Sequence, residues 1–173
     1  GWKISFFEGG IRVPYIVSWP DEIKPGQKSN SVVHHFDIFS TVTSAAGIKF
    51  KGADLDGVNL LPYINREKSS DPHKTLFWRS GNHQSILHEN WKYIVSKKEN
   101  FRWLFDTSVD PTEKNNLIES YPEKVQLLED LIAKFNSEQA ETIVPSAYEA
   151  PIMIDKYDGQ EYEAGDEYIY WSN

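Results

Sequence analysis

The sequence predicts the end of an α/β domain, followed by a small four-stranded antiparallel sheet that is packed by one C-terminal helix. Three observations support this fold class. An apolar stretch at residues 11–19 precedes a helical pattern, and a strand followed by a helix is half of a βαβ unit. Four short β-rich runs then follow between residues 74 and 105, separated by short polar turns. Apolar residues finally recur at helical spacing across residues 121–137.

The first apolar stretch, residues 11–19, is rich in β-branched and aromatic side chains and ends at Pro20. Gly9 and Gly10 before it allow a tight backbone entry. This pattern predicts a buried strand at the edge of a larger sheet, with an apolar sheet edge left bare where neighbouring strands are missing.

The helical pattern that follows predicts a helix over residues 37–46. Asp37 or Ser40 can cap its N-terminus, and Gly47 closes its C-terminus. The next polar stretch predicts mostly loop, with a short helical turn near residues 60–64.

The four β-rich runs predict an antiparallel meander. Alternation is clearest in the third run, where Trp91, Tyr93 and Val95 fall on one face. The predicted strands cover residues 74–79, 84–88, 91–96 and 101–105.

The last helix is the best defined by its pattern. Ser120 and Glu123 have the spacing of a capping box, and Pro122 lies in the first turn. One apolar stripe then faces the meander, made of Val125, Leu128, Leu131, Ile132 and Phe135. We therefore predict an α/β end at 1–73, a sheet-plus-helix subdomain at 74–144 and an acidic, aromatic tail at 145–173.

Composition and charge exclude several classes of function. The formal net charge of −8 disfavours a nucleic-acid partner, which would need a basic surface. Most of this charge lies in the tail, where seven acidic residues face a single lysine. The sequence contains no cysteine, which excludes disulfides and thiolate metal sites. No apolar run approaches the roughly 20 residues of a membrane span, so we expect no membrane contact.

The side chains and their spacing alone do not identify a class of enzyme. The five histidines lack the spacing of a helical zinc site. The glycines form no phosphate-binding loop, and no nucleophile stands beside a base in a recognisable motif.

Motifs in the first half of the chain are more informative. Residues 1–14 contain Gly-x-Lys and then Glu-Gly-Gly-Ile-Arg-Val-Pro. Trp19-Pro20 and Pro25-Gly26 follow in register, and then Asp-Ile-Phe-Ser-Thr at residues 37–41 and Asp-Gly-Val-Asn-Leu-Leu-Pro at residues 56–62.

The second half continues the same series. Residues 76–79 read Leu-Phe-Trp-Arg and residues 91–94 read Trp-Lys-Tyr-Ile. Leu104-Phe105-Asp106 precedes the Asp-Pro-x-Glu of residues 110–113 and an Asn-Asn-Leu. In this order, over about residues 1–137, the chain resembles the C-terminal part of a formylglycine-dependent, arylsulfatase-like sulfatase of the alkaline-phosphatase-like superfamily. Asp21 and Ser40 depart from the usual Gly and Pro of that pattern.

The resemblance implies an α/β enzyme that hydrolyses sulfate esters of a sulfated carbohydrate or aryl sulfate. In that family a formylglycine hydrate attacks sulfur beside a Ca²⁺ ion. This sequence lacks the Cys/Ser-x-Pro-x-Arg motif that yields formylglycine. The nucleophile and metal ligands are therefore expected in an upstream part of the same protein, and the fragment alone is expected to be inactive and to hold no cofactor. A periplasmic or secreted location is what the family implies.

The resemblance also implies site residues. Lys3 aligns with the family's active-site lysine, which contacts the substrate sulfate and helps to neutralise its oxygens. Glu8 and Arg12 match signature positions, and we expect both to be buried and to fix the loop under Lys3.

Substrate recognition is expected from the loop at residues 79–84. Its Arg79, Asn82 and His83 offer a cation, an amide and an imidazole that suit a sulfated sugar. Two alternatives stay open: a phosphonate or phosphate ester hydrolase of the same superfamily, and a non-catalytic glycan-binding module, which the net negative charge disfavours.

Overall fold

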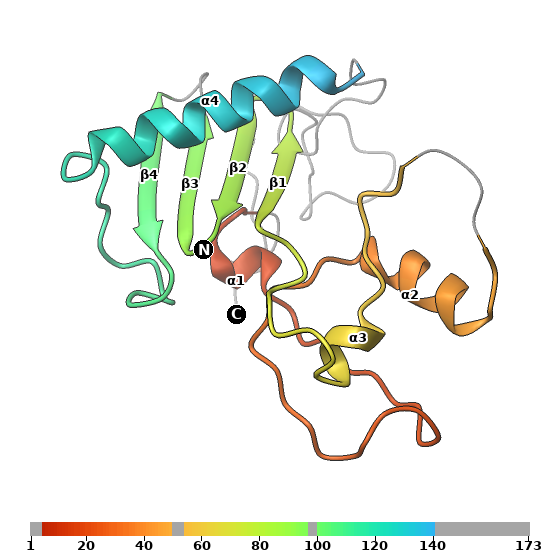
Figure 1. Cartoon of the computed structure of the whole chain (residues 1–173). Coiled ribbons are helices and arrows are strands. Elements are labelled where there is room, and N and C mark those ends of the chain that lie inside the picture. Colours follow the sequence, from red (N-terminus) through yellow and green to blue (C-terminus); the bar gives the residue numbers. More distant parts are fainter. Residues whose placement is uncertain (1–4, 50–53, 97–99, 141–173) are drawn as a thin grey trace, which may run out of the picture. The chain divides into compact units, whose positions relative to one another are not determined.

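A computed structural model describes residues 5–49, 54–96 and 100–140 (Figure 1). These residues form two compact units. Unit 1 combines residues 5–13 with the described residues from 76 to 140, and unit 2 lies within residues 14–75. Lys3 and the acidic tail predicted at 145–173 lie outside the described residues. No helix within the described ranges is long and apolar enough to cross a membrane.

Unit 1 is built on a four-stranded sheet in the order β1-β2-β3-β4. The strands are β1 (Thr75–Ser80), β2 (His83–His88), β3 (Trp91–Ser96) and β4 (Phe101–Asp106). The predicted meander is thus confirmed, with each strand boundary within about one residue of its expected place. Gly81 opens the two-residue β1–β2 turn at φ 56°, a left-handed conformation that favours glycine.

Helix α4 (Pro122–Glu138) runs across one face of this sheet (Figure 1). The core between them contains the fully buried Ile86, Tyr93 and Leu104, packed with Leu128 and its neighbours on the helix. The predicted helix and its apolar stripe are confirmed.

The predicted capping box at the start of α4 is wrong. Helix α4 begins at Pro122, one residue later than that box requires, so Tyr121 takes the cap position. No side chain makes a capping hydrogen bond there.

The opposite face of the sheet carries the N-terminal segment (residues 5–13). The Phe7 ring meets the Trp103 ring edge-on at a centroid distance of 5.0 Å, and it lies 6.0 Å from the Phe105 ring. Trp103 and Phe105 of β4 pair with Ile94 and Lys92 of β3. Both faces of β3 are therefore covered, which explains why its alternating pattern shows buried residues on each side.

The strand predicted at residues 11–19 is absent. Helix α1 (Glu8–Ile11) takes up its start, and residues 14–19 run without secondary structure. Ile16 is 90% exposed. An apolar, β-branched stretch becomes a strand only when a neighbouring strand satisfies its backbone groups, and the described part of the chain provides none for it.

Unit 2 contains helix α2 (Asp37–Ala45) and the short helix α3 (Leu61–Ile64). Both agree with the predicted positions. Gly47 follows α2 at φ 68°, as expected for a glycine that ends a helix. Unit 2 has no large apolar core among its described residues, where Ile23 and Leu60 are the buried hydrophobic side chains.

Candidate functional site

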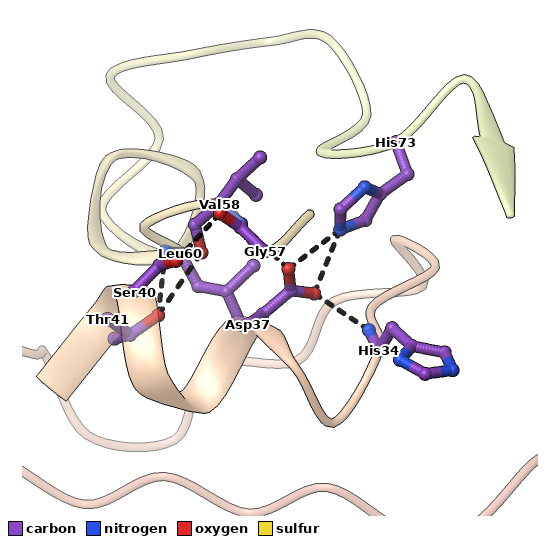
Figure 2. A network of polar contacts seen from close by, with 8 residues as sticks. All are labelled: His34, Asp37, Ser40, Thr41, Gly57, Val58, Leu60 and His73. Atoms are coloured by element: carbon purple, nitrogen blue, oxygen red, sulfur yellow. Dashed lines mark hydrogen bonds and ion pairs between the residues drawn. The ribbon is translucent and has the colours of Figure 1, made fainter. Parts of the chain in front are cut away.

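In each of the two units, a polar network joins segments that are distant in the sequence. In unit 2 the Asp37 carboxylate is fully buried at the start of α2 (Figure 2). It accepts hydrogen bonds from the backbone N–H of His34 at 2.7 Å and of Val58 at 2.9 Å. The His73 Nε2 atom lies 2.8 and 2.9 Å from its two oxygens. Because a carboxylate only accepts hydrogen bonds, Nε2 must carry the proton.

The next turn of α2 continues this network. Ser40 Oγ donates to the Gly57 carbonyl at 2.7 Å, and Thr41 Oγ1 accepts the Leu60 N–H at 3.0 Å (Figure 2). Gly57 must be glycine, because a Cβ there would lie 2.4 Å from the Phe36 carbonyl oxygen. The motifs at residues 37–41 and 56–62 are therefore in contact, and hydrogen bonds between them join α2 to the following loop.

The Asp37 network has an acid–histidine pair, and its two hydroxyl groups, those of Ser40 and Thr41, are hydrogen-bonded to backbone groups of the following loop. The carboxylate oxygens are taken by backbone donors and by His73, whose side chain is 8% exposed. Burial lowers the pKa of the nearby His34 ring, and the positive charge of a protonated His35 lowers it further. These contacts join α2 to the segments that pack around it in unit 2.

Unit 1 contains a second network, the Lys92 clamp, formed by Lys92, Glu8 and Glu113. The Lys92 ammonium is fully buried on β3 and lies 2.7 Å from Glu8 Oε1 and 2.8 Å from Glu113 Oε1. Glu113 Oε2 also accepts the backbone N–H of Glu8 at 2.6 Å. The clamp thus binds the N-terminal segment to the sheet through a side chain and a main-chain group.

Glu8 and Arg12 were expected to be buried, but Glu8 is only partly buried and Arg12 is exposed. The Glu8 side chain is 18% exposed and bound in the clamp. The Arg12 side chain is 63% exposed, which contradicts the prediction. It lies one helical turn beyond Glu8 and reaches Glu8 Oε2 at 3.5 Å from the solvent side, where its charge keeps its hydration.

The three residues predicted to contact substrate do not converge on one point. Arg79 is the penultimate residue of β1 and lies on the side of α4, where its guanidinium donates to the Ala140 carbonyl at 3.3 Å. His83 begins β2, is buried, and its ring lies 5.5 Å from the Phe101 ring. Asn82 is exposed in the turn between the two strands. Their role in binding substrate stays a prediction.

His83 and Arg79 lie on opposite faces of the sheet. Leu87 pairs with Lys92, so the alternate residue His83 shares the face of the Lys92 clamp. Arg79 shares the face of Phe77, whose ring stacks on Phe135 of α4 at 4.2 Å.

A calcium site is not formed by the residues that the structure describes. Nowhere in residues 5–49, 54–96 and 100–140 are three His, Cys, Asp or Glu side chains grouped so that they could hold a metal ion. The described residues therefore do not fit the Ca²⁺ ion that the resemblance implies.

Sequence reasoning overlooked the part played by Lys92. Its place in a strand gives no sign of burial, since lysine is rarely buried. A signal was nevertheless present, because Glu8, Lys92 and Glu113 each stand in one of the motifs shared with sulfatases. Motif residues that are charged and far apart in sequence are candidates for a common network.

Relatives and solved structures define the class of the protein. An N-acetylgalactosamine-6-O-sulfatase of Bacteroides thetaiotaomicron is 27% identical over 147 residues, which covers 76% of this chain and 29% of the relative. An ulvan-active sulfatase of Formosa agariphila is 28% identical over 169 residues, covering 75% and 33%.

A solved Bacteroides thetaiotaomicron structure, described with the metabolism of multiple glycosaminoglycans, superimposes with a TM-score of 0.64. It is 26% identical, and the match covers 76% of this chain and 30% of that one. Sheet, helix and motifs thus define a part of a sulfatase of the alkaline-phosphatase-like fold. The chain spans about a third of the length of the curated relatives above.

The particular family follows from a family model. The model described as "N-sulphoglucosamine sulphohydrolase, C-terminal" matches residues 2–141. The chain belongs to this family.

Proposed function

We propose that the protein containing this chain hydrolyses sulfate esters, and that its substrate is a sulfated carbohydrate or an aryl sulfate. The observation that carries the proposal is the family match over residues 2–141, which includes the Lys3 to Pro14 signature and the Asp-Pro-x-Glu motif. The names of the two relatives, an N-acetylgalactosamine-6-O-sulfatase and an ulvan-active sulfatase, support a carbohydrate substrate.

The chain contributes Lys3 to the reaction in this proposal. Cleavage of a sulfate ester places negative charge on the sulfate and leaving-group oxygens, and a fixed ammonium group stabilises that charge. Loss of one such contact typically costs 10²–10³-fold in kcat, or about 3–4 kcal/mol.

Formylglycine and Ca²⁺ belong to an upstream part of the same protein in this account. Support comes from the length of the chain, which spans only about a third of the curated relatives that it matches. We therefore expect the 173-residue chain alone to hydrolyse no sulfate ester.

The role of Lys3 is tested by Lys3→Ala in the full-length protein with 4-nitrophenyl sulfate as substrate. We expect kcat/KM to fall about 100-fold, and Lys3→Arg to retain part of the activity because it keeps the charge. Lys28→Ala, which removes an exposed lysine of unit 2, is the control. An unchanged kcat/KM for Lys3→Ala would remove Lys3 from the mechanism and leave the sulfatase assignment standing.

A second experiment tests the substrate side. Asn82 lies in the β1–β2 turn, whereas Asn90 lies in the β2–β3 turn at the other end of β2, and both are exposed. If the first turn contacts the sugar, Asn82→Ala raises KM for a sulfated sugar several-fold with kcat little changed, and Asn90→Ala changes neither. Equal effects of both variants would argue against a sugar contact at Asn82.

A further inference from the structure

Three charged residues from distant parts of the chain meet inside unit 1. Glu8 lies 84 residues before Lys92 and 105 residues before Glu113. Each comes from a different motif, and the three are brought into contact by strand β3, helix α1 and the turn after β4. Their contacts attach the N-terminal segment, through Glu8, to the rest of unit 1.

Burial of the Lys92 ammonium costs free energy, because the charged group loses its hydration. Lys92 lies on β3 between β2 and β4, and its side chain is 0% exposed. A buried ammonium needs paired carboxylates, which Glu8 and Glu113 supply. With the solvent-facing Arg12, the two positive and two negative charges balance.

The backbone conformation of Glu113 also indicates that the surrounding structure fixes the clamp. Its backbone is left-handed at φ 55°, which is unfavourable for a residue other than glycine and persists only when the surroundings impose it. Asp110 holds this turn, because its Oδ2 accepts the N–H groups of Lys114 and Asn115 at 2.8 Å each. Those hydrogen bonds lower the pKa of the Asp110 carboxyl, so it stays ionised.

We propose that Lys92 and Glu113 are positioning residues for Lys3, acting through Glu8. Lys3 precedes Glu8 by only five residues, so the backbone that carries Lys3 leads directly into the segment that the clamp anchors. The Oε2 atom of Glu113 fixes the Glu8 main chain itself, which restricts the segment more than a side-chain contact alone. This inference rests on the proposed sulfatase function.

The test uses the full-length protein with Lys92→Met, which keeps the length of the side chain and removes its charge. The milder Glu113→Gln keeps the shape of the side chain and serves if Lys92→Met does not fold. We expect each variant to lower kcat/KM for 4-nitrophenyl sulfate at least tenfold. Lys134→Met, which removes an exposed lysine of α4, is the matched control and leaves kcat/KM unchanged.

The decisive measurement repeats both substitutions in a Lys3→Ala background. If the clamp acts through Lys3, Lys92→Met and Glu113→Gln lower kcat/KM in the wild-type background and change it less than twofold when Lys3 is absent. A merely structural role lowers activity by the same factor in both backgrounds. That equal loss would overturn the proposal.

Hydrogen exchange separates this inference from the function on which it depends. Amides of residues 5–13 should exchange at least tenfold faster in Lys92→Met and Glu113→Gln than in wild type and Lys134→Met. If the wild-type protein releases no sulfate but this difference appears, the sulfatase proposal fails and the anchoring of Glu8 stands. If the amides are unaffected in both variants, the clamp does not hold the segment and the inference is wrong.

Discussion

Replacement of Asp37 by alanine is the sharpest test of the packing in unit 2. The substitution removes the acceptor for two backbone N–H groups, those of His34 and Val58, and for the His73 Nε2–H. All of these lie around a carboxylate that is fully buried. No other acceptor is brought within reach by the substitution itself, so the donors must be rehydrated or left unpaired.

The magnitude follows from the donors that lose their partner. A buried donor left unsatisfied costs about 1–3 kcal/mol, and water entering the vacated space recovers part of that cost. For three donors we expect the free energy of local opening to fall by about 3 kcal/mol. Since every 1.4 kcal/mol is a factor of ten, amide exchange at Val58 should accelerate by about 100-fold.

Hydrogen exchange followed by mass spectrometry measures this opening in peptides that contain Val58 and His34. Asp37→Asn keeps the side-chain volume but places an NH₂ group against a donor, so it should show most of the same acceleration. Asp21→Ala, an exposed aspartate of the same unit, is the control and should stay close to wild type. Exchange at Val58 in Asp37→Ala within threefold of wild type would refute this account of the network.

Two further predictions concern packing and ionisation. Gly57→Ala should destabilise unit 2 by more than about 2 kcal/mol, because its Cβ would overlap the Phe36 carbonyl. Gly47→Ala has open space around it, so only its left-handed backbone should contribute, at about 1–2 kcal/mol. Thermal unfolding of both variants compares the two costs. Burial and the hydrogen bond to Glu129 at 2.7 Å raise the pKa of Tyr93 well above its usual 10. The unfolded chain therefore loses this proton first, and the free energy of unfolding should fall as pH rises above about 10, by up to 1.4 kcal/mol per pH unit. The urea midpoint measured against pH reports this fall, which should be absent in Tyr93→Phe. An equally steep fall in Tyr93→Phe would contradict the prediction.

The sheet and α4 were predictable because their signals are local. Period-two alternation, short turns and one apolar stripe of helical spacing each describe an element whose partners are its neighbours in sequence. The strands β1–β4 accordingly appear where the pattern of the sequence places them. The start of α4 was missed by one residue, since Ser120 and Tyr121 compete for the cap and only geometry decides between them.

Features that depend on distant partners could not be predicted in the same way. Residues 14–19 have the composition of a strand, but composition does not reveal whether another strand lies beside them. Lys92 has a pattern typical of a surface residue, and its burial depends on Glu8 and Glu113, which are remote in sequence. The motifs shared with sulfatases were the only sequence signal that linked these positions.

The central claim is that the protein containing this chain cleaves sulfate esters. The most direct measurement is the release of inorganic anion by the full-length protein from two matched substrates, N-acetylgalactosamine 6-sulfate and N-acetylgalactosamine 6-phosphate. Our account predicts release of sulfate at a kcat/KM well above that for phosphate. Faster release of phosphate would point to a phosphate ester hydrolase of the same superfamily. No release from either substrate, and none from an aryl sulfate, would contradict the claim.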